Sequence, residues 1–322
     1  MTYSIAIHGG AGTISRKRFT PDKQIAYYQA LAEAIIVADT LLAKGGTALD
    51  AVEAAVIILE NCPLFNAGRG AVFTNEGKHE MDASIMTGHD LQAGAVAFVH
   101  GVRNPIKLAR TVMEQSEHVF LCGTGAEQFA QINGLPFEPE SYFFTQDRFN
   151  QLQEAQRDDK IQLDHSEKED VSNDPLDKKH GTVGAVALDM HGNVAAATST
   201  GGLTNKKFGR IGDSSIIGAG TYANNQSCAV SCTGYGEFYI RGVVAYDVSC
   251  LIEYKGLSLD EACRIVIHEK QIKLGSDGGL IAVDAHGNIC LSYNSEGMYR
   301  AYKRHNSPLF VAVFDEELHL PK

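Results

Sequence analysis

A strongly charged stretch runs directly into an apolar one in the middle of this chain. Residues 157–180 hold eight acidic and five basic side chains, with only isolated apolar residues between them. Such a segment buries too little apolar surface to offset the entropy lost on ordering, so we predict a mobile linker over 157–180. Gly181 and Thr182 follow at once and open the apolar run 183–188, which is typical of a buried strand. A hydroxyl residue therefore stands at the border between a linker and a core.

The composition indicates a folded domain with small-molecule rather than polyanionic partners. With 322 residues, 44% hydrophobic and 21% charged, the chain has ample length for one buried core. A net charge of -11 argues against nucleic acid and against a membrane surface as main partners. No apolar run approaches the ~20 residues of a membrane span, and the first residues lack the pattern of a signal peptide.

The seven cysteines are an odd number and lie scattered along the sequence. Without a signal peptide, this pattern predicts free thiols and a cytoplasmic location. The spacings of zinc sites are absent from the sequence, so a transition-metal enzyme is not favoured.

Hydrophobic periodicity and turn residues predict an α+β fold with antiparallel sheets. Helices are expected over 21–44, 47–61, 104–115, 238–254 and 258–270, and strands over 4–7, 71–73, 81–86 and 92–99. Two further hairpins turn at the repeated pattern Asp-x-His-Gly-Asn, at 189–193 and 284–288. We interpret them as two unrelated hairpins that use the same turn chemistry.

Two glycine-rich segments raise the question of nucleotide binding. Gly123-Thr124-Gly125 lacks the third glycine of the dinucleotide fingerprint, and the segment 8–12 lacks its spacing. The first is better explained as a turn between a strand and a helix. Nucleotide binding is therefore weakly supported.

Thr182 is the residue with the most distinctive chemical position. A threonine hydroxyl is a poor nucleophile until a base takes its proton. If the peptide bond before Thr182 were cut, its own α-amine, with a reference pKa of ~7.7–8.0, would be such a base. Gly181, without a Cβ, would tolerate the strained geometry that attack on its carbonyl requires. On position alone, Thr182 can also be simply a β-branched residue that begins a strand.

Six motifs, spread in order over nearly the whole chain, resemble the plant-type L-asparaginase and isoaspartyl peptidase family of N-terminal-nucleophile hydrolases. The motifs are HGGAG at 8–12, CPLFNAG at 62–68, GTVGAVALD at 181–189, AATSTGG at 196–202, GRIGDS at 209–214 and SCTGYGE at 231–237. The charged segment also stands where this family has a disordered one.

The resemblance implies a fold and a maturation step. It implies a single domain over 1–322, built as a four-layer αββα sandwich of antiparallel sheets. The precursor would cut itself between Gly181 and Thr182, giving an α subunit, 1–181, and a β subunit, 182–322. The active form would be a dimer of such αβ heterodimers, with no cofactor for catalysis.

The resemblance also assigns roles to individual residues. Thr182 would be the nucleophile and, once free, the base, while Thr200 orients its hydroxyl. Thr233 and the N–H of Gly234 would face the developing oxyanion. The remaining assignments are Arg210 on the substrate α-carboxylate, Asp213 on the α-ammonium, Gly234 and Gly236 as points where the substrate approaches the backbone, and Asn66 as an aid to self-cleavage.

A structural sodium ion is implied at the loop 59–70. Main-chain carbonyl oxygens are hard ligands that suit such a cation. The carbonyls implied are those of Leu59, Glu60, Cys62, Phe65, Ala67 and Arg69.

The activity implied is hydrolysis of β-aspartyl dipeptides and of L-asparagine, with release of L-aspartate. Three alternatives stay open: a glycosylasparaginase, a threonine protease that cuts after aspartate, and a non-enzymatic acidic scaffold whose linker recruits partners. The scaffold predicts an intact chain, whereas the enzyme predicts two fragments.

Overall fold

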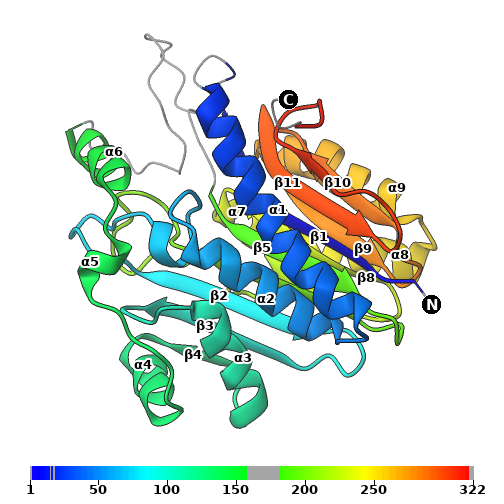
Figure 1. Ribbon diagram of the computed structural model, residues 1–322, viewed down its shortest axis with the longest axis horizontal. Helices are drawn as coiled ribbons and strands as arrows, with labels where there is room; N and C mark the ends of the chain where they lie inside the picture. The colour runs from blue at the N-terminus through cyan, green and yellow to red at the C-terminus, as the bar shows by residue number, and fades with distance from the viewer. Residues whose placement is uncertain (1, 15, 17–18, 158–180, 319–322) are drawn as a thin grey trace.

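Two β-sheets form the centre of the molecule (Figure 1). The computed structural model describes residues 2–14, 16, 19–157 and 181–318. The predicted linker over 157–180 lies, apart from Arg157, outside the described residues. Arg157 itself ends helix α6 (Gln146–Arg157).

The larger sheet has eight strands, and all neighbouring pairs except one are antiparallel. In spatial order its strands are β12 (Phe310–Ala312), β11 (Gly297–Arg304), β1 (Ser4–Gly12), β5 (Val183–Leu188), β6 (Val194–Thr200), β2 (Met81–Thr87), β3 (Ala93–Val99) and β4 (Phe120–Cys122). The exception is β4, which runs parallel to β3 because helix α3 returns the chain to the same end of the sheet. The expectation of purely antiparallel sheets is wrong at this edge.

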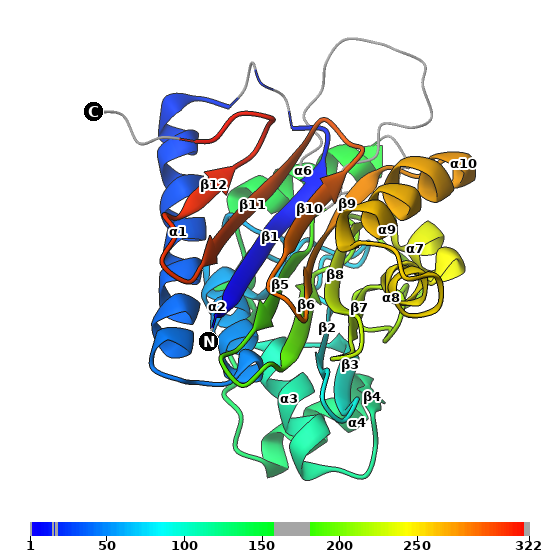
Figure 2. The ribbon, with the colours of Figure 1, turned by 90° about the vertical axis from the view of Figure 1, so that its right-hand side faces the viewer.

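The smaller sheet has four antiparallel strands and lies against the larger one (Figure 2). In spatial order they are β10 (Ile289–Tyr293), β9 (Gly278–Asp284), β8 (Cys228–Gly234) and β7 (Thr221–Ala223). Strands β8 and β9 contact β1 and β5 of the larger sheet. The space between the sheets is filled mainly by small apolar side chains, among them Ala6, Val186, Ala196, Ala223 and Ala229. Such side chains let the backbones approach closely.

Helices cover the outer faces of both sheets. On the larger sheet α1 (Pro21–Ala43) packs on β1 and β11, α2 (Ala48–Asn61) on β5 and β6, and α3 (Pro105–Gln115) on β2 and β3. On the smaller sheet α8 (Val244–Lys255) packs on β8, and α9 (Leu259–Ile265) on β9 and β10. The other helices are α4 (Gly123–Ile132), α5 (Glu140–Phe143), α7 (Gly236–Gly242) and α10 (Ile272–Leu274), with a π-helical turn, η3 (Val266–Gln271), before α10.

The start signals in the sequence place the long helices correctly. Thr20, Thr47 and Ser258 each accept a hydrogen bond from the backbone N–H three residues on, and so cap α1, α2 and α9. The predicted helix 104–115 is also confirmed, with Pro105 in its first turn.

Two predicted elements are wrong. Residues 71–73 form no strand, because they belong to the loop that follows α2. The predicted helix 238–254 is two helices, since Val243 has a left-handed backbone, φ 48°, between α7 and α8.

The repeated turn pattern works as predicted in both places. Asp189 Oδ1 accepts hydrogen bonds from the N–H groups of His191 and Asn193, and Asp284 Oδ1 does the same for His286 and Asn288. One turn joins β5 to β6 in the larger sheet, and the other joins β9 to β10 in the smaller.

Among the described residues, α1 alone is long and apolar enough to span a membrane by length and composition. The length of uninterrupted apolar runs in the sequence did not identify α1 as a possible membrane span. Its buried side chains, including Leu31, Ile35 and Leu42, belong to the core beneath the larger sheet, which is the usual position of an apolar helix in a globular fold.

The close approach of α3 to β3 depends on Gly94. A Cβ at Gly94 would overlap the carbonyl oxygen of Ala109 and lie 2.7 Å from the backbone nitrogen of Met113. We expect Gly94→Ala to lower the free energy of unfolding by about 1–3 kcal/mol, because neither helix atom can turn aside. Urea unfolding measures this, with Gly125→Ala, which has open space around its Cβ, as the control. Equal stability of the two variants would contradict the close packing.

Candidate active site

The border between linker and core lies at one end of the larger sheet. Thr182 immediately precedes β5, and Thr200 is the last residue of β6. Because Val183 pairs with Ser199 in the antiparallel ladder, Thr182 and Thr200 are brought side by side. Asn66 reaches the same point from the loop after α2, and all three side chains are buried.

Two donors converge on the carbonyl oxygen of Gly181. Asn66 Nδ2 donates to it at 2.9 Å, and Thr200 Oγ1 donates to it at 3.0 Å. Asn66 is itself fixed, since its Nδ2 also donates to the Gly202 carbonyl at 2.8 Å and its Oδ1 accepts from the Val72 N–H at 2.9 Å. The pair is arranged like the donors that stabilise negative charge on a carbonyl oxygen.

The Thr182 hydroxyl is aligned by the same threonine. Thr182 Oγ1 donates to Thr200 Oγ1 at 3.3 Å, and the Gly202 N–H donates to Thr200 Oγ1 at 3.0 Å. Thr200 therefore accepts from the hydroxyl that would attack and donates to the carbonyl that would be attacked.

Thr233 lies at the end of β8 and contacts the glycine-rich segment of β1. Its Oγ1 accepts from the Ala11 N–H at 3.2 Å. The next residue, Gly234, lies against the ring of Tyr239, which a Cβ would overlap. Close packing on Tyr239 is thus a structural reason for glycine at 234, beside the predicted approach of substrate.

Arg210 makes a contact that the sequence did not predict. Its Nε and Nη2 donate to the two carboxylate oxygens of Glu237 at 2.9 and 2.7 Å, a bidentate pair. A Cβ at Gly236 would lie 2.8 Å from Arg210 Nη2 and 3.0 Å from Asp213 Oδ1. The structure therefore brings Arg210, Asp213 and Gly236 together and gives the arginine a carboxylate partner, Glu237.

Asp213 is a buried carboxyl group whose Oδ2 has no hydrogen-bond partner among the residues that the structure describes. Burial raises its pKa to about 7, against the opposing charge of Arg210. A buried carboxyl oxygen that accepts no hydrogen bond from a described residue is a suitable acceptor for an ammonium group.

Comparisons with known proteins identify the family of this chain. Residues 1–311 match the family model described as asparaginase. The chain is 53% identical to an isoaspartyl peptidase of Escherichia coli (strain K12) over 300 residues, covering 92% of each chain. It is 43% identical to the isoaspartyl peptidase/L-asparaginase of Homo sapiens over 295 residues, covering 91% of each. The chain belongs to the asparaginase family.

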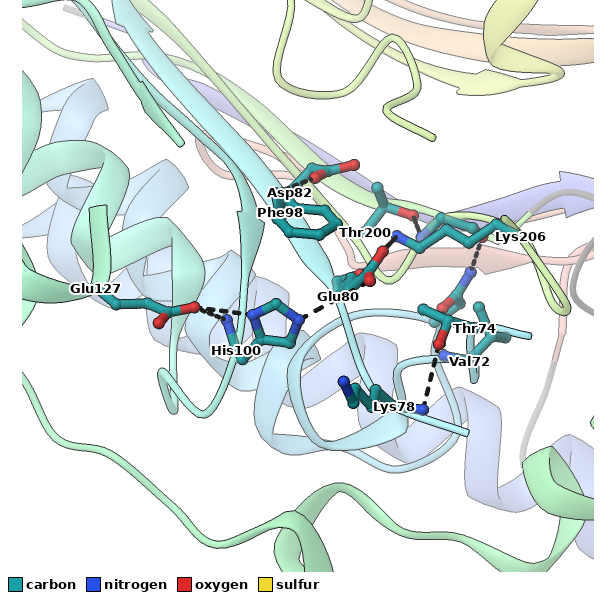
Figure 3. A network of polar contacts seen from close by, with 12 residues as sticks. Val72, Thr74, Lys78, Glu80, Asp82, Phe98, His100, Glu127, Thr200 and Lys206 are labelled. Atoms are coloured by element: carbon teal, nitrogen blue, oxygen red, sulfur yellow. Dashed lines mark hydrogen bonds and ion pairs between the residues drawn. The ribbon is translucent and has the colours of Figure 1, made fainter. Parts of the chain in front are cut away.

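This asparaginase-family chain also has a network of charged side chains, formed around Lys206 and Glu80, next to Thr200 (Figure 3). Lys206 is buried, and its Nζ donates to the Glu80 carbonyl at 2.8 Å and lies 3.8 Å from Glu80 Oε2. Nζ also lies so near Gly202 that a Cβ there would be 2.9 Å away. The lysine thus supports the turn whose N–H holds Thr200. His100 extends the network, since its Nε2 lies 3.9 Å from Glu80 Oε1 and its Nδ1 lies 2.8 Å from Glu127 Oε1.

Sequence reasoning missed Glu237 and Lys206, although both lie in or beside quoted motifs. Glu237 ends the motif SCTGYGE, and Lys206 lies between two others. For Glu237 the available signal was a charged residue in a glycine-rich segment. The sequence could not say that each side chain would lie against an opposite charge, Glu237 against Arg210 and Lys206 against Glu80.

The loop after α2 carries the main-chain carbonyls for which the sequence predicted a cation. The carbonyls of Leu59, Cys62, Phe65 and Ala67 each accept one backbone hydrogen bond, which leaves a second lone pair on each oxygen. Gly68 has a left-handed φ of 51° and packs on the Glu60 carbonyl, which closes the loop. Arg148 Nε donates to the Gly70 carbonyl at 3.0 Å and fixes its far end.

Glu60 links this loop to the strand that carries Thr200. Its Oε1 accepts from Ser199 Oγ at 2.7 Å and from the Ile106 N–H at 3.0 Å, and its Oε2 accepts from Asn104 Nδ2 at 3.0 Å. Burial nevertheless raises its pKa to about 7, with the three donors opposing the shift.

We expect Glu60→Gln to flatten the pH dependence of stability. The pKa of Glu60 is higher in the folded chain than its ordinary value of ~4.3, so the folded state binds more protons between these values. Its contribution is therefore largest at low pH and is lost as the pH rises through about 7. Urea unfolding at pH 5 and pH 8 should show a fall in wild type that is about 1–2 kcal/mol larger than in the variant.

The control for this measurement is Glu76→Gln, at an exposed glutamate. This control should keep the wild-type pH dependence. The same slope in Glu60→Gln and in wild type would show that Glu60 does not titrate in this range.

Proposed function

We propose that this chain cuts itself between Gly181 and Thr182 and then hydrolyses β-aspartyl dipeptides and L-asparagine to release L-aspartate. The observation that carries the proposal is the convergence of Asn66 Nδ2 and Thr200 Oγ1 on the Gly181 carbonyl, beside the Thr182 hydroxyl. The relatives named isoaspartyl peptidase support the choice of substrate.

The first step would be attack within the chain. Thr182 Oγ1 bonds to the Gly181 carbonyl carbon, and the charge on the carbonyl oxygen is met by Asn66 and Thr200. The peptide C–N bond then breaks, and the hydroxyl proton ends on the new α-amine of Thr182. Water hydrolyses the resulting ester, which leaves a carboxylate at Gly181 and a free hydroxyl at Thr182.

Turnover would use the same hydroxyl with its own amine as base. The amine accepts the proton while Oγ1 attacks the side-chain carbonyl of the aspartyl group, and ammonia or an amino acid leaves. Thr233 and the N–H of Gly234 would stabilise the oxyanion. Water then hydrolyses the β-aspartyl ester and frees aspartate.

Arg210 and Asp213 would hold the two charged groups of the aspartyl substrate. Glu237 takes the edge of the guanidinium formed by Nε and Nη2, so the substrate α-carboxylate would meet the other edge, at Nη1 and Nη2. Asp213 would receive the α-ammonium through Oδ2.

The finer features of the fold and assembly belong to the same proposal. Helices on the outer faces of two facing sheets support a four-layer αββα sandwich as one domain over 1–322, matured into 1–181 and 182–322. The loop carbonyls of Leu59, Glu60, Cys62, Phe65, Ala67 and Arg69 would hold a structural sodium ion. A dimer of αβ heterodimers and a cytoplasmic location remain predictions.

All seven cysteines are free thiols, as the sequence predicted.

Replacing the nucleophile is the direct test. We expect Thr182→Ala to remain one band of 34.8 kDa on a denaturing gel and to be inactive on β-aspartyl dipeptides, whereas wild type gives two bands. Thr182→Ser, which keeps a hydroxyl, should still be cut. Normal splitting of the alanine variant would refute the assignment, and an intact, inactive wild-type chain would favour the scaffold alternative.

The raised pKa of Asp213 predicts how substrate binding changes with pH. Below about 7 the free enzyme would hold Asp213 protonated, and above it the carboxylate could attract the α-ammonium. The KM for a β-aspartyl dipeptide should therefore fall by about tenfold between pH 6 and pH 8. Asp213→Asn should show a high KM without this change.

The exposed Asp260→Asn serves as the matched control and should keep the wild-type profile. If the KM of Asp213→Asn falls with pH as steeply as that of wild type, another group controls binding.

A further inference from the structure

A row of buried polar side chains runs between the sheets and ends on the backbone of Thr182. His8 Nδ1 lies 3.1 Å from the Thr182 carbonyl oxygen, and His8 Nε2 lies 3.0 Å from Ser231 Oγ. The row continues from Ser231 to Thr198 at 2.7 Å, and from Thr198 to Thr221 at 2.6 Å. Ser84 is its last member, 2.8 Å from Thr221. The five residues come from β1, β8, β6, β7 and β2, and all are buried.

The contact of His8 with the Thr182 carbonyl determines which group donates and which accepts along this row. A carbonyl oxygen can only accept, so His8 Nδ1 carries the proton that reaches Thr182. Burial lowers the pKa of His8 to about 3, so the ring is neutral and Nε2 is an acceptor. Ser231 must then donate to His8.

Each hydroxyl has one proton, so the rest of the row is determined in turn. Since Ser231 donates to His8, Thr198 donates to Ser231, and Thr221 donates to Thr198. Ser84 donates at the far end, toward Thr221 or the Ser214 carbonyl. From Thr221 to His8 the donors all point toward Thr182, an arrangement in which neighbouring hydrogen bonds polarise one another.

The packing leaves the imidazole little freedom. A Cβ at Gly184, two residues after Thr182, would overlap both Ser231 Oγ and His8 Nε2. His8 is also opposite Gly184 in the ladder between β1 and β5. The ring therefore lies against the strand that begins just after the nucleophile.

Thr182 needs such a contact because it lies outside the ladders. Pairing of β5 ends at Gly184 toward β1 and at Val183 toward β6. After a cut, Thr182 would be a chain end, and ends fray unless something fixes them. An error of about 1 Å in a reacting group can lower the rate by about 10²-fold.

We propose that His8, oriented by Ser231, is a positioning residue that holds the Thr182 carbonyl and so keeps the nucleophile and its amine in reacting geometry. This inference rests on the proposed function, since it concerns the same site. His8 does not take a proton in the reaction, and the base remains the Thr182 amine.

Two replacements of His8 separate this role from a merely structural one. Asn places its amide nitrogen near the position of Nδ1, so His8→Asn keeps the donor to Thr182 and loses the contact with Ser231. Gln places its amide group near Nε2, so His8→Gln keeps a partner for Ser231 and loses the donor to Thr182. Each variant keeps one of two buried hydrogen bonds, so both should lose similar stability.

The experiment measures kcat and KM on a β-aspartyl dipeptide with full-length, matured protein, and the melting temperature of each variant. We expect His8→Asn to stay within a few-fold of the wild-type kcat and His8→Gln to lose about 10²-fold, with KM little changed in both. Ser231→Ala, which leaves the donor but frees the ring, should lose less kcat than His8→Gln.

Equal kcat in His8→Asn and His8→Gln, or losses that follow the melting temperatures, would overturn the proposal. If a variant matures slowly, its rate of self-cleavage on a gel gives the same comparison, and equal rates for the two variants would overturn it as well. Wild type without activity on the dipeptide would instead refute the proposed function. Active wild type with two equal variants would refute the role of His8 alone.

Discussion

The carbonyl of Gly181 is the point on which the site is built. Asn66 and Thr200 both donate to it, and they arrive from different parts of the fold. The loop that carries Asn66 is closed by Gly68 and fixed by Arg148, while the strand that carries Thr200 is tied to α2 through the contact of Ser199 with Glu60. Helix, loop and sheet must therefore all be in place before two donors can meet on one oxygen. A site of this kind depends on packing well beyond its own residues.

Burial of ionisable groups is the common cost of this arrangement. Glu60 and Asp213 both have pKa values raised to about 7 by burial, and the pKa of Lys206 is lowered by the same cause. His8 is kept neutral. Each group has donors or an opposite charge nearby, which limits the cost, and in a poorly solvated site each interaction is stronger than it would be in water. Burial of these groups therefore lowers the stability of the fold, and it also fixes polar groups in and near the candidate site.

The sequence predicted what depends on local pattern and missed what depends on burial. Thr47 before α2, Pro105 at the start of α3 and the Asp189 turn each act within a few residues, and all three were found. The motifs also placed Thr182, Thr200 and Asn66 at one site. No spacing could show that Arg210 would pair with Glu237, or that His8 would reach Thr182 from 174 residues away, because such contacts depend on how distant segments of the chain pack together.

The order of strands explains why a cut before Thr182 need not separate the two parts. In the larger sheet β1 lies between β11 and β5, and β2 lies beside β6. Strands β1 to β4 come from 1–181, and β5, β6, β11 and β12 come from 182–322, so each part is bonded to the other at three junctions, β11–β1, β1–β5 and β6–β2. Separation would break three ladders and expose the core on both faces of the sheet. A cut at the end of a central strand would therefore release one amine while the remaining contacts of Thr182, with Thr200 and His8, can stay as they are.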